Sequence, residues 1–116
     1  MGRGGAAAPR AVSGADLIFR RSRYASIVDA QLGAFERENT TLLERIDSAL
    51  REYDSADRDD AEELFGEYMD AHALAAEILE EMRDHYARTL DDPDEYVQAF
   101  NRAVRKRMPV TATELD

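Results

Sequence analysis

Two histidines and a series of carboxylates are the side chains of this chain that could do chemistry. Glu81 and His85 stand four residues apart, so one face of a helix would present both and could hold a metal ion loosely. A helix salt bridge is the simpler use of the same spacing. His72 stands alone, and it could be a buried polar group, a metal ligand or a proton carrier. We expect no metal at either histidine.

A carboxylate metal site of the ferritin type needs glutamates that face the inside of a helical bundle, and a Glu-x-x-His spacing on a helix. Neither histidine supplies this spacing, because Met69 and Met82 stand three residues before them. The inward positions of the predicted helices hold no carboxylate. A metal-binding bundle is therefore an alternative only if oligomerisation assembles the site from flanking acids such as Glu38 and Glu77.

Other catalytic signatures are missing from the sequence. There is no cysteine, which removes thiolate catalysis, disulfides and thiolate metal sites together. Gly33 and Gly66 each stand alone inside predicted helices and form no phosphate-binding loop. No serine and histidine make a recognisable nucleophile arrangement. The sequence therefore predicts a protein that is not an enzyme and carries no cofactor.

Basic side chains gather toward the two ends of the sequence. The two clusters are Arg20, Arg21 and Arg23, and Arg102, Arg105, Lys106 and Arg107. Residues 24–100 carry six arginines against 22 acids, and the whole chain has a net charge of −10. Because an acidic body repels phosphates and anionic lipid surfaces, nucleic acid and membrane are disfavoured partners. A nucleic-acid accessory protein that uses only the basic clusters is a second alternative.

A long amphipathic helix over about residues 17–54 is the first element that must position these groups. Its apolar side chains recur at alternating steps of four and three residues, which is a heptad pattern. The seam consists of Val28, Leu32, Phe35, Asn39, Leu42, Ile46, Ala49 and Tyr53. Such a stripe must be buried against a second element.

A second helix is expected over about residues 59–90, after a run of polar turn residues. Its seam repeats the same spacing with Ala61, Phe65, Tyr68, His72, Ala75, Leu79, Met82 and Tyr86. Pro93 opens a short third helix that runs to about residue 107, and Pro109 stops it. The sequence thus predicts an all-α fold, in which a long antiparallel hairpin and a third helix form a three-helix bundle or half of a dimeric bundle.

Folding the two long helices about their turn places residues at equal distances from it side by side. Asn39 and His72 then share one layer, and we expect a buried polar pair that fixes the register of the hairpin. The same arrangement brings the first basic cluster to Asp84, Asp91 and Asp92, where exposed ion pairs can form.

Apolar side chains beyond the two seams predict an interface near the turn. The third helix covers only ~22 Å at 1.5 Å per residue, about half of a hairpin of ~45 Å. It leaves uncovered an apolar patch of Leu43, Leu50, Leu64 and Met69. We expect this patch to bind a second copy of the chain or another protein.

The expected domain organisation is a disordered leader over 1–15, a single helical domain over 16–108 and a flexible acidic tail over 109–116. No apolar stretch approaches the roughly 20 residues that cross a bilayer, and we expect a cytoplasmic protein. The function that the sequence favours is a non-enzymatic interaction or structural module, self-associating through the turn-proximal patch.

Overall fold

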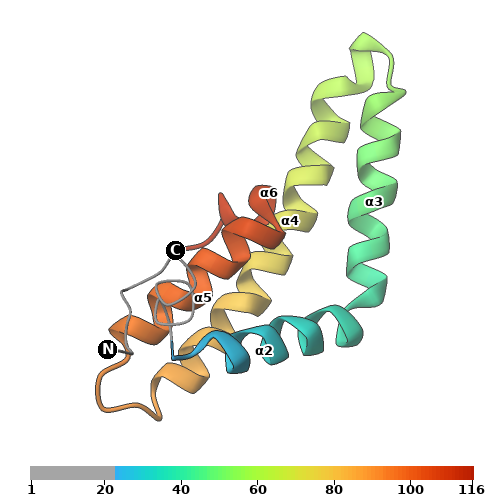
Figure 1. The fold of residues 1–116 in the computed structure, drawn as a ribbon. Helices are drawn as coiled ribbons and strands as arrows, with labels where there is room; N and C mark the ends of the chain where they lie inside the picture. Colours follow the sequence, from blue (N-terminus) through green and yellow to red (C-terminus); the bar gives the residue numbers. More distant parts are fainter. Residues whose placement is uncertain (1–22) are drawn as a thin grey trace, which may run out of the picture.

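The computed structural model describes residues 23–116, and every regular element in this range is an α-helix (Figure 1). The helices are α2 (Ala25–Glu38), α3 (Thr40–Asp54), α4 (Arg58–Ala87), α5 (Asp94–Arg107) and α6 (Pro109–Ala112). The predicted all-α class is therefore confirmed. The expectations for residues 1–15 and for Arg20 and Arg21 lie outside the described residues.

Helix α4 is the longest element, and α3 runs antiparallel beside its first half (Figure 1). The Ser55 hydroxyl donates to the Arg51 carbonyl at 2.9 Å and closes the last turn of α3. Asp59 and Asp60 then stand in the first turn of α4, where the helix dipole favours negative charge. Local interactions thus explain both the end of α3 and the start of α4, and with them the polar turn between the two helices.

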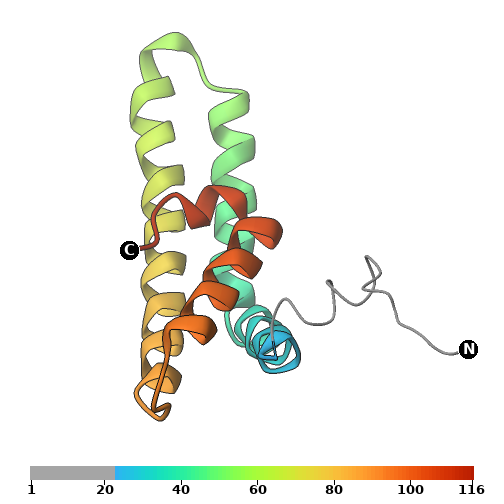
Figure 2. The ribbon, with the colours of Figure 1, turned by 60° about the vertical axis from the view of Figure 1, so that its left-hand side comes forward.

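The predicted continuous helix over 17–54 is wrong, because the chain breaks between α2 and α3 at Asn39. Asn39 has φ −126° and ψ 37°, and its side-chain amide donates to the Phe35 carbonyl at 2.9 Å. An asparagine that bonds the backbone of its own turn competes with helical geometry. Two β-branched residues, Thr40 and Thr41, follow it. Helix α2 therefore leaves the line of α3 and packs against α5 (Figures 1 and 2).

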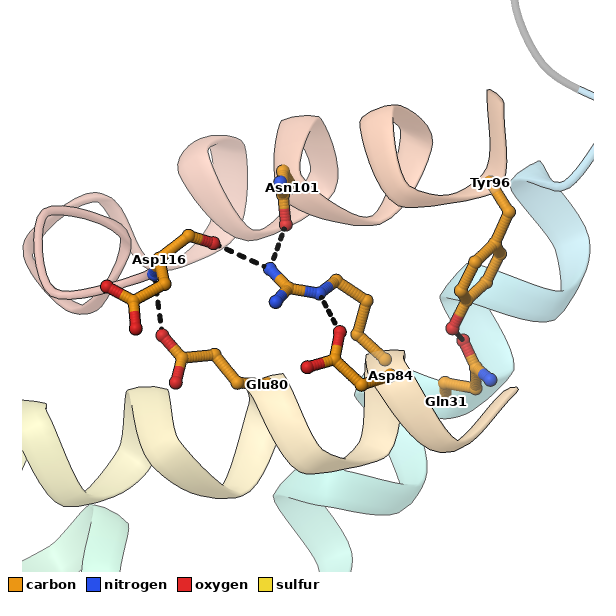
Figure 3. Close-up of polar contacts among 7 residues, drawn as sticks. Gln31, Glu80, Asp84, Tyr96, Asn101 and Asp116 are labelled. Atoms are coloured by element: carbon orange, nitrogen blue, oxygen red, sulfur yellow. Dashed lines mark hydrogen bonds and ion pairs between the residues drawn. The ribbon is translucent and has the colours of Figure 1, made fainter. Parts of the chain in front are cut away.

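The main core lies where α2 and α5 meet the second half of α4. Its buried apolar residues are Val28, Leu32 and Phe35 from α2, Ala75 and Leu79 from α4, and Tyr96, Ala99, Phe100 and Val104 from α5. The fully buried Tyr96 ring packs against Tyr86 at 4.7 Å and Tyr24 at 5.6 Å between ring centroids. Its hydroxyl donates to Gln31 Oε1 at 2.8 Å, so the buried phenol is satisfied (Figure 3).

Residues 109–116 differ from the flexible acidic tail that we expected. Helix α5 ends at Arg107, before Pro109, as predicted, but Pro109 then opens α6, as proline at a first helical position can. Thr111 is buried and Leu115 packs against the core. The segment is ordered by these contacts, which local sequence pattern does not encode.

The structure therefore has two parts, which we call the base and the arm. The base consists of α2, α5, α6 and the second half of α4. The arm is the antiparallel pair of α3 and the first half of α4, and its tip projects beyond the base in both views (Figures 1 and 2). No helix within residues 23–116 is long and apolar enough to cross a membrane.

Candidate functional site

The predicted polar layer of Asn39 and His72 does not form. The Asn39 amide is bonded to the Phe35 carbonyl, and the residue lines a shallow pocket together with Leu42 and Ile78. His72 instead bonds Thr111 of α6. The break in the helix at Asn39 is the reason. There the Asn39 side-chain amide donates to the Phe35 carbonyl of its own turn, so it does not face His72.

His72 is buried between the arm and α6, with 7% of its surface exposed. Its Nδ1 lies 2.7 Å from Thr111 Oγ1, and the Tyr68 ring meets it edge-on at 4.6 Å. Its Nε2 has no hydrogen-bond partner in the described structure. Burial lowers the pKa of His72, and the nearby Glu114 carboxylate opposes this shift only in part. Burial therefore favours the neutral form of the imidazole.

Glu81 and His85 lie exposed on the second half of α4, as do the flanking acids Glu38 on α2 and Glu77 on α4. Within the described part of the chain, no three His, Asp or Glu side chains gather as ligands for a metal ion. Two ligands on one helix are fewer than the three or four protein ligands of a zinc site. We find no chemistry to assign to this pair.

Arg83 is a buried residue that sequence reasoning missed. It is 7% exposed, and its Nε donates to Asp84 Oδ1 at 2.8 Å. One terminal nitrogen donates to Asn101 Oδ1 at 3.0 Å and to the Asp116 carbonyl at 2.9 Å. The Asp116 amide in turn donates to Glu80 Oε2 at 2.6 Å (Figure 3). Arg83 thus ties residues 109–116 to α4 and α5. Its position four residues after Leu79, on the apolar face, was the available signal.

Arg23 is the one member of the first basic cluster that the structure describes, and it does not reach the acids that we predicted. Arg23 lies 3.9 Å from Glu95 Oε1 and 5.2 Å from the centre of the Tyr24 ring, instead of meeting Asp84, Asp91 or Asp92. Both charged side chains of this pair are largely exposed. Because α2 packs against α5 and not along α4, the start of the described chain lies beside α5.

The second basic cluster forms one wall of a groove between α2 and α5. We call it the basic groove: it has a volume of about 370 Å³ and is lined by Ala25, Val28, Asp29, Ala99, Arg102, Ala103, Lys106 and Arg107. Arg107 lies 3.4 Å from Asp29 Oδ1 across it. Arg105 is exposed but does not line it. The basic groove thus combines a floor of small side chains with a cationic rim.

The turn-proximal patch is present in part, on the arm. Leu50 is 39% exposed, whereas Leu43 packs against the core and Leu64 and Met69 are half-buried. We placed Phe65 in the buried seam of the second helix. That prediction is wrong, because 46% of its surface is exposed.

Phe65 belongs to the same surface as Leu50 and Met69. Phe65, Met69 and His72 share one face of α4 because they are four and seven residues apart. The Phe65 ring also contacts Tyr53 at 5.3 Å, so Leu50, a turn before Tyr53, lies level with Met69. We name Leu50, Phe65 and Met69 the arm patch.

Acidic residues are frequent in the part of the arm that carries the arm patch. Residues 51–70, which form the tip of the arm, hold nine acids and two arginines. Asp54 stands four residues after Leu50 and Glu62 three residues before Phe65, so both flank the patch. Helix α6 covers the His72 end of the same face of α4 but does not reach the tip (Figure 2). Comparisons with protein-family models, with curated proteins and with solved structures found no match.

Proposed function

We propose that this protein is a non-enzymatic interaction module that self-associates through the arm patch. The observation that carries the proposal is the exposure of Phe65, a large aromatic side chain, inside a row of apolar residues. Aromatic side chains bury about 150–250 Å² each and dominate the energetics of interfaces. An exposed apolar row with a polar rim is the usual character of a protein-binding surface.

The two-helix construction of the arm supports the proposal further. Two helices cannot bury apolar faces this wide against each other alone, and the arm extends past the helices of the base. A second copy supplies the missing cover without a further gene product, and a two-fold arrangement closes after two chains. The proposal includes a cytoplasmic location, which fractionation of cells that express the full chain would test.

Sedimentation of the full chain over a micromolar concentration series tests the proposal. We expect a monomer–dimer equilibrium that Leu50→Ala with Phe65→Ala shifts to the monomer. Leu74→Ala is the matched control, because Leu74 is also exposed, at 40%, but lies in a separate pocket with Leu42 and Ile78. A wild-type chain that stays monomeric over the whole series would refute the proposal.

A further inference from the structure

We infer that the basic groove between α2 and α5 receives the acidic arm of the second copy. The two copies then lie antiparallel, related by a two-fold axis, with two equivalent arm-to-groove contacts. This inference rests on the proposed self-association, and it names the surface on which the arm patch docks.

The chemistry of the groove is the first argument. Its floor of Ala25, Ala99 and Ala103 leaves room for a bulky side chain from a partner. Its rim carries Arg102 and Lys106, which are exposed and form no ion pair with the described part of the chain. A volume of about 370 Å³ is at the lower end of the range for ligand pockets, about 300–1,000 Å³. The site therefore fits an apolar side chain that is accompanied by negative charge.

The arm supplies that combination. Phe65 is exposed at 46%, and Glu62 and Asp54 flank the arm patch. Seated in the groove, Phe65 would reach the alanine floor while the two carboxylates meet the cationic rim. Phe65 and the rim cations are accessible on the same chain, so each copy can both offer an arm and accept one.

Charge decides the relative orientation of the two copies. Two arm tips placed side by side would bring together nine acids from each chain against two arginines from each. Juxtaposing like charges at an interface costs several kcal/mol, whereas opposite charges fix the register and speed association. An antiparallel pair separates the two tips by the length of the arm and places each tip beside the cations of the other copy. The antiparallel arrangement is therefore favoured over the parallel one.

A charge-swap experiment tests the inference. One variant carries Arg102→Glu and Lys106→Glu in the groove, and the other carries Asp54→Lys and Glu62→Lys on the arm. We expect each variant alone to dimerise about tenfold or more weakly than wild type. An equimolar mixture should restore dimers, because every arm then faces a groove of opposite charge in the mixed pair. Native mass spectrometry with one variant isotopically labelled identifies that pair.

The controls separate this inference from the proposed self-association. Arg105→Glu changes the charge of α5 equally but lies outside the groove, so it should leave the dimer intact. Far-UV circular dichroism at 222 nm verifies that each variant folds. If Leu50→Ala with Phe65→Ala abolishes the dimer while both charge-reversed variants still dimerise, the arm patch docks elsewhere and the inference fails alone. Variants that weaken the dimer but are not rescued by mixing would also overturn it.

Nucleic acid is the competing ligand for a cationic groove. We expect wild-type protein not to retard DNA or RNA at moderate salt. Retardation that the Arg102→Glu, Lys106→Glu variant removes, with unchanged self-association, would assign the groove to phosphates and overturn the inference.

Discussion

The His72 imidazole and the Thr111 hydroxyl join α4 to α6, with 2.7 Å between Nδ1 and Oγ1. Thr111 is 2% exposed, so this contact is closed to solvent on both sides. The other ring nitrogen, Nε2, is buried without a partner. A proton added to the ring would therefore be held in a site that does not solvate its charge.

This environment predicts that stability decreases in mild acid. A base whose pKa is lowered on folding binds protons more weakly in the folded state than in the unfolded state. The loss therefore begins as the pH falls through the ordinary histidine value of 6.5. For this one group the slope cannot exceed about 1.4 kcal/mol per pH unit, and it ends once the folded-state histidine also binds the proton. Urea unfolding of wild type and His72→Gln at pH 7.5 and 5.5 measures it. Equal pH dependence of the two proteins would contradict the prediction.

Arg83 predicts a second measurable effect, on the attachment of residues 109–116. Arg83→Met keeps an apolar stem but removes the donors to Asn101 and to the Asp116 carbonyl. We expect a loss of about 1–3 kcal/mol in unfolding free energy, because the variant loses the hydrogen bonds of a buried charged group. Compared with wild type, amide hydrogen exchange should be faster in residues 110–116 of the variant, with a smaller change in α4. Arg88→Met, at an exposed arginine near the end of α4, is the control and should change neither quantity.

Tyr96→Phe should separate the hydroxyl from the ring in the base core. The variant loses only the hydrogen bond to Gln31, for which we expect about 0.5–1.5 kcal/mol of destabilisation. Tyr96→Ala also removes the buried ring and should cost about 3–5 kcal/mol. Denaturant unfolding of both variants gives the ratio. Similar losses for the two would show that the ring contributes little to the core.

Gly66→Ala should stabilise the arm. A methyl group at this position meets no atom within 4 Å, and glycine inside a helix costs about 0.5–1 kcal/mol relative to alanine. We expect a higher midpoint of thermal unfolding by a few degrees. Gly33→Ala is the comparison, because its new methyl lies 3.3 Å from the flexible end of Arg37. A lower midpoint for Gly66→Ala would contradict the prediction.

Helical periodicity predicted α4 and α5 to within about three residues at each end, since capping and apolar spacing are local properties. The break at Asn39 was not predictable in the same way. The heptad pattern continues through Asn39 whether the helix is straight or bent. The choice depends on whether Val28 and Phe35 pack along α4 or against α5, which is a tertiary competition.

The partner of His72 was missed for a related reason. Thr111 lies in a short segment between Pro109 and two acids, without any apolar period. Its burial comes from α6 crossing α4, and one helical turn leaves too few residues for a pattern. The exposure of Phe65 likewise depends on how far α5 and α6 extend along α4. The residues around Phe65 carry no information about that distance.

The break at Asn39 has a consequence for how such a molecule could change in evolution. Because α2 departs there, the packing of the base involves little of α3. Whole heptads could be inserted or deleted in α3 and in the facing part of α4 as matched pairs, and the rest of the molecule would keep its geometry. In the proposed dimer, the distance between the arm patch and the basic groove would then be an adjustable length, and chains that differ in it would fail to assemble with one another.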